Sequence, residues 1–230
     1  MEAVLDDFDT YLKAFGYTLL LFLVAGVASM IIGTFLAACR VSPVPVLRGA
    51  AATWVTLVRN TPLVIVFGTL SFMAPMLWTR LNFRWVDVHI GPFDFTAFFS
   101  AAVLALSLYT SAFVCEAMRS GINAVPLGQA EAARAIGLPF SGVMTQVVLP
   151  QALRASVPPL ASVQIALIKN TSVAAVFGVA EATSRMTSFN NDFASQRTSI
   201  FLCFAVGYIV LVEIFSFFSS RLERRWRVAR

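Results

Sequence analysis

The stretch AFGYTLLLFLVAGVASMIIGTFLAAC, residues 14–39, contains 26 consecutive residues without a charge. A second stretch, FTAFFSAAVLALSLYTSAFVC, residues 95–115, contains 21 more. A helix needs about 20 apolar residues to cross the hydrocarbon core of a bilayer, so each stretch is long enough to span a membrane. The chain is therefore expected to be an all-α polytopic membrane protein.

The composition of the whole chain supports this interpretation. Of its 230 residues, 58% are hydrophobic and only 13% are charged, whereas about 25% of residues are charged in a typical soluble domain. So few charges cannot cover the surface of a soluble protein of this length. Most of the surface is therefore expected to face lipid.

Five transmembrane spans are predicted within a single domain over residues 1–230. They cover about residues 15–38, 55–79, 95–114, 158–180 and 199–219. The second span is interrupted by Arg59, Asn60, Thr61 and Pro62. The apolar stretch around it, residues 49–77, is too long for a straight helix across a hydrocarbon core of about 30 Å. A helix that is broken or tilted at this point is expected.

Basic residues outside the spans predict the orientation, because cytoplasmic loops carry more lysine and arginine. If the N-terminus is outside, eleven basic residues face the cytoplasm and five face outward. The inner residues are Arg40, Arg48, Arg59, Arg119, Arg134, Arg154, Arg221, Arg224, Arg225, Arg227 and Arg230. The outer residues are Lys13, Arg80, Arg84, Arg185 and Arg197. We therefore expect the N-terminus outside and the C-terminus in the cytoplasm.

The net charge of +5 does not indicate a nucleic-acid-binding protein. Five of the 17 basic residues lie in the last ten positions, directly after an apolar stretch, which is typical of a cluster that meets anionic membrane lipid. The three cysteines include no CxxC pair, so neither a disulfide framework nor a metal site is expected. The N-terminus is acidic, unlike a cleaved signal peptide, so the first span is expected to stay in the membrane.

The longest predicted cytoplasmic segment covers residues 116–154 and is rich in helix formers. One short helix is expected over residues 129–137, ending at Gly137. A second short helix is expected over residues 141–148, ending near Pro150. Periodicity alone leaves two interpretations open, a compact cytoplasmic hairpin or an amphipathic loop at the membrane interface.

The residue spacing within this segment is distinctive. Glu131-Ala132-Ala133 is followed by three residues, Gly137, nine residues, and then Val147-Val148-Leu149-Pro150. This pattern resembles the EAA signature of bacterial ABC importer permeases, with Val147 in place of isoleucine. In that family the loop forms a coupling helix that docks on the ATP-binding subunit. The resemblance implies this ATPase-coupling role for Gln129, Ala130, Glu131, Ala132, Ala133 and Gly137.

Four other segments resemble landmarks of the polar amino acid permeases of the histidine, glutamine, glutamate and arginine group. They are residues 59–63, 119–122, 149–154 and 169–172. Residues 40–43 and 129–134 look closest to actinobacterial glutamate permeases. The resemblance implies ATP-driven import of a polar amino acid, glutamate first, across the bacterial cytoplasmic membrane. The implied partners are a cytoplasmic ABC ATPase dimer, an extracytoplasmic amino-acid-binding protein and a second permease subunit, identical or paralogous.

The chemistry that the chain lacks limits its role. No GxxxxGK[ST] nucleotide-binding loop occurs, and His89 is the single histidine. We therefore expect no catalytic residue, metal or cofactor in this subunit, with ATP and Mg²⁺ bound by the partner ATPase. The alternative is an ion-coupled secondary transporter or channel subunit, in which Lys169 and Glu213 would relay ions.

Five polar residues are predicted to line a substrate pathway, namely Arg59, Thr61, Lys169, Asn170 and Thr171. Charges at membrane depth are costly, so they face a cavity or a partner. Arg59 either binds a substrate carboxylate through its planar guanidinium or marks the cytoplasmic end of a short span over residues 62–79. Lys169 either faces a cavity or forms an internal ion pair with Glu116, Glu181 or Glu213.

Overall fold

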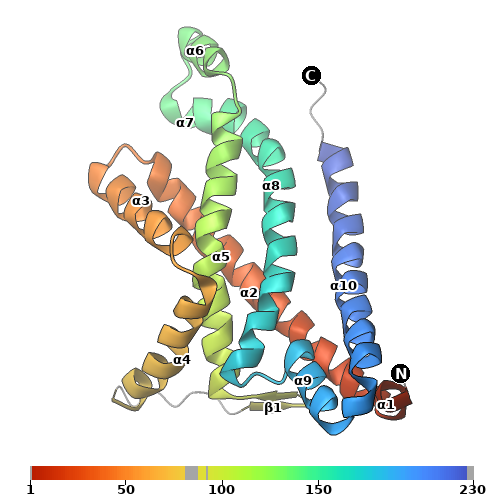
Figure 1. The fold of residues 1–230 in the computed structure, drawn as a ribbon. Helices are drawn as coiled ribbons and strands as arrows, with labels where there is room; N and C mark the ends of the chain where they lie inside the picture. Colours follow the sequence, from red (N-terminus) through yellow and green to blue (C-terminus); the bar gives the residue numbers. More distant parts are fainter. Residues whose placement is uncertain (1, 81–87, 92, 227–230) are drawn as a thin grey trace.

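The computed structural model describes residues 2–80, 88–91 and 93–226, and most of them are helical (Figure 1). Arg84, Arg227 and Arg230 lie outside the described residues. Within the described part, four helical segments are long and apolar enough to cross a membrane, and one bent pair of helices makes a fifth candidate. The predicted all-α membrane fold is confirmed.

The first long helix, α2 (Phe8–Val41), follows the short helix α1 (Glu2–Asp6). The Asp7 carboxylate caps the start of α2 by accepting a hydrogen bond from the Thr10 amide at 3.4 Å. The helix stops just before Pro43, because the residue that precedes a proline disfavours helical geometry. Its 34 residues measure about 51 Å, so α2 extends beyond the predicted span over residues 15–38 and runs obliquely (Figure 1).

The second span consists of two helices, α3 (Pro45–Arg59) and α4 (Leu63–Arg80). The two axes are bent by 102°. Pro62 has no amide hydrogen and its ring clashes with the preceding turn, so a helix cannot continue through it unchanged. The Thr61 hydroxyl donates to the Leu57 carbonyl at 2.8 Å and satisfies one acceptor at the end of α3. The break lies at the position that the sequence predicts.

A small hairpin of β1 (Val88–Ile90) and β2 (Phe93–Phe95) precedes the central helix α5 (Ala97–Asn123). The two strands are antiparallel, with Val88 opposite Phe95. The Thr96 hydroxyl caps α5 by accepting from the Phe99 amide at 3.4 Å. Because α5 ends at Asn123 and not near residue 114, the start of the predicted cytoplasmic segment is a continuation of this helix.

The rest of that segment contains one short helix and the start of a long one. α6 (Leu127–Ala135) lies where a helix is expected. The predicted separate helix over residues 141–148 is wrong, because α7 (Phe140–Gly142) and the π-helical turn η1 (Val143–Val148) continue directly into α8 (Leu149–Asn170).

Contrary to the sequence-based prediction, no helix ends near Pro150, and α8 contains three prolines. Pro150 lies in the first turn of α8, directly after the π-helical turn η1, so the helix continues through it. Pro158 and Pro159 lie inside the helix, and membrane helices tolerate such prolines. The helix that contains the fourth predicted span therefore begins before residue 158.

The chain continues through the 3-10 segment η2 (Thr171–Phe177), which ends at Gly178 with a φ of +83°. Residues 178–180, predicted as the end of the fourth span, are thus not helical. The helix α9 (Ala182–Asp192) and the 3-10 turn η3 (Ala194–Gln196) lead to α10 (Arg197–Trp226), which contains the predicted fifth span.

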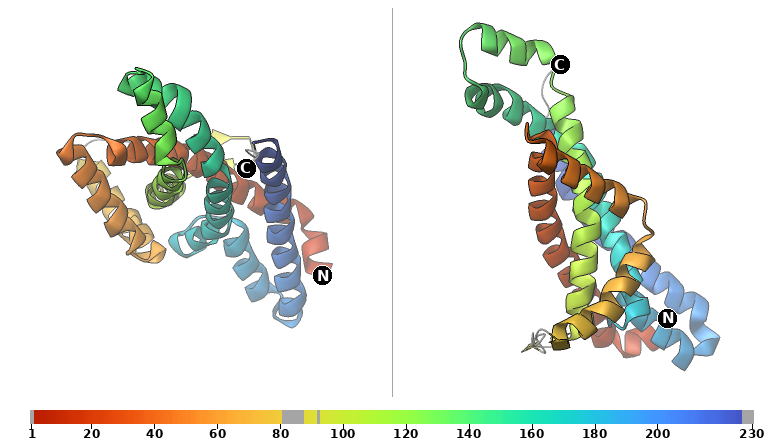
Figure 2. Two further views of the ribbon diagram at one scale, coloured as in Figure 1. Left: turned by 90° about the horizontal axis from the view of Figure 1, so that it is seen from above. Right: turned by 90° about the vertical axis from the view of Figure 1, so that its left-hand side faces the viewer.

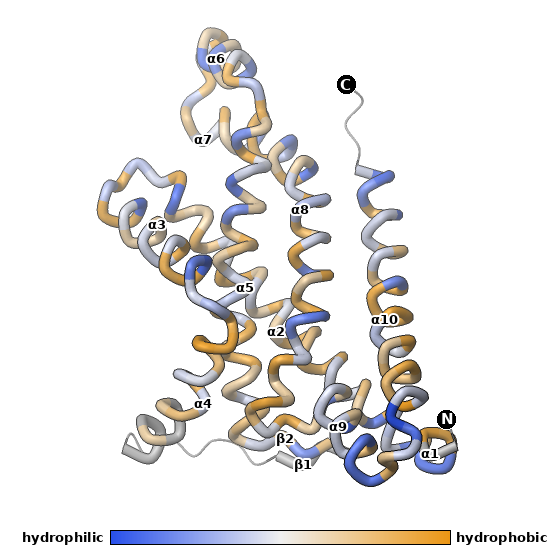
Figure 3. Tube along the Cα trace, viewed as in Figure 1, coloured by the Kyte–Doolittle hydropathy of each residue, from blue (hydrophilic) through white to orange (hydrophobic). Residues whose placement is uncertain are grey.

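The core forms around α5, which packs against α2, α3, α4 and α8 (Figure 2). Small residues allow this close packing. A Cβ atom at Gly33 would meet the Val114 side chain, and one at Gly121 would meet the Ser156 side chain. In the most apolar 18-residue stretch of α5, 61% of the residues are buried, whereas only 11% are buried in the corresponding stretch of the segment that contains α10. Hydrophilic residues concentrate near the two ends of the bundle (Figure 3).

Candidate functional site

The first candidate site is a hairpin at one end of the molecule, formed by α6 and the start of the following helix (Figure 1). α6 begins after Pro126 and is followed by Gly137, whose φ of +88° a glycine adopts without strain. The Leu138 amide donates to the Ala133 carbonyl at 3.1 Å, and the Gly137 amide donates to the Arg134 carbonyl at 2.9 Å. These bonds satisfy carbonyls at the helix end and reverse the chain.

The two faces of α6 differ. One face carries Ala130 and Ala133, which are buried against Val143 and Val148 of η1. Away from this face the Glu131 side chain is exposed. Leu127 at the start of α6 and Ile136 just after its end are 79% and 80% exposed. A helix that exposes a carboxylate and has exposed apolar side chains at its two ends is chemically suitable for docking another protein.

A side-chain hydrogen bond joins α6 to α8. The Gln151 amide group donates to the side-chain carbonyl of Gln129 and, at 2.9 Å, to the backbone carbonyl of Val147. Between them in the sequence lies η1, a π-helical turn. Such turns are rare in proteins, and those that occur are often found at functional sites. Because η1 runs straight into α8, this bond and the packing against η1 connect α6 to a helix that is long enough to span a membrane.

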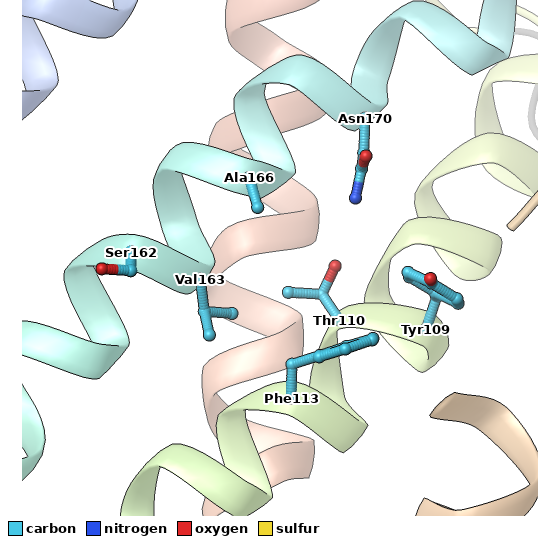
Figure 4. Close-up of a pocket in the computed structure, with 7 residues that line it drawn as sticks. All are labelled: Tyr109, Thr110, Phe113, Ser162, Val163, Ala166 and Asn170. Atoms are coloured by element: carbon cyan, nitrogen blue, oxygen red, sulfur yellow. The ribbon is translucent and has the colours of Figure 1, made fainter. Parts of the chain in front are cut away.

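The second candidate site is a cavity of about 340 Å³ between α5 and α8 (Figure 4). The lining residues are Tyr109, Thr110, Phe113, Ser162, Val163, Ala166 and Asn170. None of these seven residues is charged. An apolar wall with a few polar groups is typical of a site for a small ligand.

Two polar side chains from different helices project into this cavity. Asn170 is the last residue of α8, and its amide group points toward α5 (Figure 4). Thr110 on α5 is 3% exposed, and its hydroxyl has no hydrogen-bond partner among the described residues. A buried hydroxyl without a partner costs free energy, so a polar ligand atom beside Thr110 would be stabilised.

A cluster of charges lies next to this cavity. The Glu116 carboxylate on α5 is 3.0 Å from the guanidinium of Arg40, 3.3 Å from that of Arg119 and 3.9 Å from that of Arg59. One negative charge thus faces three positive charges and ties the ends of α2 and α3 to α5. Arg59 is held at the longest distance, and its side chain is 46% exposed. Its guanidinium also lies 5.8 Å from the ring centroid of Phe113, which lines the cavity.

The structure separates the residues that the sequence predicts for a substrate pathway. Asn170 lines the cavity, and Arg59 contacts its wall through Phe113. Thr171 is fully buried, and its hydroxyl donates to the Ile168 carbonyl at 2.7 Å. Since the Thr61 hydroxyl is likewise bonded to the preceding turn of its chain, these two threonines have a local structural role.

Lys169 is placed differently from the sequence-based expectation. It lies one residue from the end of α8, and its side chain is exposed. In the described part of the chain it forms no ion pair with Glu116, Glu181 or Glu213. It is also absent from the lining of the cavity.

Glu181 forms a buried polar cluster toward the opposite end of the bundle. Its side chain is 0% exposed and caps α9 by accepting from the Ser184 amide at 2.9 Å. The Tyr208 hydroxyl donates to it at 2.7 Å and the Thr18 hydroxyl at 3.4 Å. Burial raises the pKa of the Glu181 carboxyl, and these hydrogen bonds oppose the rise. The cluster joins α2, α9 and α10.

The sequence alone does not predict three of the residues in these sites. It indicates Glu116 and Glu181 only as possible ion-pair partners of Lys169, and Thr110 is one of several hydroxyl residues in an apolar stretch. The signal for Glu116 is its position as the first charge after the uncharged residues 95–115. No local signal marks Thr110 or Glu181, because their burial depends on which helices pack around them.

Sequence comparison gives consistent matches over the chain. Residues 29–228 match the family model described as binding-protein-dependent transport system inner membrane component. The glutamate transport system permease protein GluC of Corynebacterium efficiens is 44% identical over 200 residues, which is 87% of this chain and 86% of that protein. GluC of Corynebacterium glutamicum is 39% identical over 219 residues, 95% of each chain.

Solved structures share the fold. A crystal structure of an amino acid ABC transporter with histidines superposes with a TM-score of 0.82 and 26% identity, covering 96% of both chains. An inward-facing conformation of the MetNI methionine ABC transporter gives a TM-score of 0.73 at 18% identity, covering 97% of this chain and 99% of that chain. The second likeness concerns the arrangement of helices alone.

Proposed function

The chain belongs to the family of binding-protein-dependent transport system inner membrane components, and from this premise we propose that it carries glutamate into the cell. It is a permease subunit of an amino-acid ABC importer and a multi-pass protein of the cytoplasmic membrane. In this family the ATPase is a separate subunit. Glutamate is the substrate named for both GluC relatives, which supports it as the substrate here.

The proposed coupling to the ATPase rests on the hairpin that contains α6. Its helix stands beyond the spans, is held by η1 on one face and presents Glu131 on the other. We assign α6 as the element that docks on the ATPase. The bond between Gln129 and Gln151 then passes movement to α8, which carries Asn170 at its far end.

The cavity between α5 and α8 is the proposed part of the substrate pathway. The Thr110 hydroxyl and the Asn170 amide can each bond a carboxylate or an ammonium without adding charge. Arg59 and the two other arginines around Glu116 make the nearby region positive. An amino acid with a net charge of −1, such as glutamate, is favoured in such a field over a cationic one.

The proposed assembly contains a cytoplasmic ATPase dimer, an extracytoplasmic amino-acid-binding protein and a second permease subunit, identical or paralogous. The N-terminus is assigned to the outside and the C-terminus to the cytoplasm, which places α6 on the side where ATP is available. ATP and Mg²⁺ belong to the partner ATPase, and this subunit supplies no catalytic residue. An ion-coupled transporter is not the better description, because the family works with ATP.

Reconstitution tests the proposal directly. The permease is placed in proteoliposomes with its ATPase and binding protein, and uptake of radiolabelled glutamate, glutamine and arginine is measured with and without ATP. We expect ATP-dependent uptake of glutamate that exceeds uptake of arginine at equal concentration. Uptake that favours arginine would refute the substrate assignment, and uptake of glutamate without ATP would refute the coupling assignment.

A further inference from the structure

An apolar groove of about 550 Å³ runs between α2 and α10. The helices touch where the Tyr11 hydroxyl donates to the Cys203 carbonyl at 3.1 Å, and again where the Phe22 and Phe215 rings meet edge to face with 5.3 Å between their centroids. Gly207 permits this approach, because a Cβ atom there would meet the Phe15 ring and the Tyr11 hydroxyl. Because α2 is inclined away from α10 (Figure 1), the two helices leave an apolar groove beside these contacts.

The described part of the chain covers the α10 side of the groove only in part. Val210, Ile214 and Phe218 line it and are 51%, 55% and 64% exposed. Opposite them Leu19 and Leu23 of α2 are 43% and 49% exposed. Apolar surface of this extent in a membrane protein must be covered by lipid chains or by another protein helix.

The same face of α10 continues into arginines. An α-helix turns by about 100° per residue, so Arg221 and Arg225 lie within about 20° of Ile214 around the helix axis. Arg224 lies about 80° away and Glu223 on the opposite side. Arg221 and Arg225 are exposed, and the Arg221 guanidinium lies 4.4 Å from the ring centroid of Phe217. An apolar stripe thus ends in two positive charges on one line.

This arrangement matches one class of ligand. We infer that the groove binds an anionic phospholipid, with an acyl chain between α2 and α10 and its phosphate at Arg221 and Arg225. The stripe from Gly207 to Phe218 measures about 17 Å, close to the roughly 15 Å of one leaflet of the hydrocarbon core. The inference rests on the proposed cytoplasmic C-terminus, where anionic lipid attracts basic residues.

The charge pattern favours lipid over a second copy of the chain. A self-association through this face would bring Arg221 and Arg225 of two copies close together with no counter-charge between them, where like charges repel. A lipid phosphate instead supplies a negative charge that attracts both arginines. The lipid also fills the widening part of the groove, because its chains adapt their shape.

Native mass spectrometry of the purified importer complex tests the inference. The complex is delipidated and incubated with equal amounts of phosphatidylglycerol and phosphatidylcholine that carry identical acyl chains. We expect preferential retention of phosphatidylglycerol by the wild type. The double substitution Arg221→Gln and Arg225→Gln should reduce this preference by about tenfold or more, because each arginine near an anionic lipid contributes about fivefold.

Two matched variants separate the head group from the groove. Arg224→Gln removes the same charge from a neighbouring position off the stripe, and it should retain the preference. Ile214→Trp fills the groove, so it should lower retention of both lipids and leave their ratio unchanged.

Three results would overturn the inference. They are equal retention of the two lipids by the wild type, an equal effect of Arg224→Gln and the double substitution, and a disulfide between two copies through Ile214→Cys in a chain without other cysteines. Lipid retention is measured without transport, so its failure is distinguishable from a failure of the glutamate assignment.

Discussion

The Arg59 guanidinium at the end of α3 lies 5.8 Å from the ring centroid of Phe113 on α5. This contact joins the 102° bend of the second span to the wall of the cavity that holds Asn170. Arg59 is also the most loosely held of the three arginines at Glu116. The bend therefore places a guanidinium beside the wall of this cavity.

Asn170→Asp should change selectivity. A carboxylate at this position repels the side chain of glutamate in a cavity of low dielectric, while it favours neutral and cationic amino acids. We expect uptake of glutamate to fall about tenfold relative to glutamine, which corresponds to about 1.4 kcal/mol. Competition for uptake by glutamate, glutamine and arginine measures the change.

A second variant controls for altered packing in the cavity. Ser162→Ala removes another lining hydroxyl, which donates to the Pro158 carbonyl at 3.2 Å, and it should leave the rank order intact. If Asn170→Asp also preserves the rank order in a fully assembled importer, α8 is not a selective element.

Glu131→Lys should uncouple ATP hydrolysis from transport. The substitution reverses a charge on the exposed face of α6, and a reversed charge at an interface causes repulsion from a matching partner. Gly137→Leu should act similarly, because its φ of +88° disfavours a side chain. The readout is ATPase activity stimulated by the substrate-loaded binding protein.

Gly128→Ala is the matched control for the hairpin, because a Cβ atom at Gly128 has no neighbour within 4 Å. It should retain full stimulation. Normal stimulation in both Glu131→Lys and Gly137→Leu, with normal amounts in the membrane, would refute the docking role of α6.

Single cysteines test the orientation of the chain. In a background without Cys39, Cys115 and Cys203, an impermeant maleimide should label Asp94→Cys in intact cells and should not label Gly128→Cys. Both positions are exposed and lie in different parts of the structure, one in β2 and one in α6. The reverse labelling pattern would place the N-terminus in the cytoplasm.

Glu116→Gln should destabilise the protein. It leaves Arg40, Arg59 and Arg119 facing one another without a counter-charge, and loss of one partner of such a group costs about 1–3 kcal/mol of unfolding free energy. Arg119→Gln removes a more exposed contact and should cost less than about 1 kcal/mol. Thermal unfolding of both variants in detergent provides the comparison, and equal effects would show that Glu116 does not hold the cluster.

Glu181 predicts a specific dependence of stability on pH. Burial raises the pKa of its carboxyl in the folded state above the ordinary value of 4.5, so folding favours the protonated form. The contribution of the protonated Glu181 carboxyl to the free energy of unfolding is fully present below the pKa of the unfolded state. It is lost as pH rises through the higher pKa of the folded state.

Glu181→Gln removes this titration and retains an oxygen that can accept from Tyr208. We expect the decline in thermal stability as pH rises above 4.5 to be smaller in the variant than in the wild type. Identical profiles for the two proteins would contradict a protonation-linked role for Glu181.

Local patterns in the sequence were sufficient for the membrane class, for the break at Pro62 and for α6. A charge-free stretch of 26 residues has few alternatives to a span, and a proline or a glycine acts on its own backbone. Local reasoning did not foresee that α8 continues through Pro150 and Pro158, because a continuous helix accommodates prolines when its neighbours and position permit.

Only the tertiary structure decided which polar residues meet. Asn170 and Thr110 are 60 positions apart in the sequence and face one cavity because α5 and α8 pack together at Gly121 and Ser156. Glu116 forms ion pairs with arginines from three helices. Glu181 contacts Thr18 and Tyr208 because α2, α9 and α10 pack together. The sequence by itself determined which segments enter the membrane, since that depends on local hydropathy. Their side-chain partners depend on helix contacts between distant segments, which no local pattern contains.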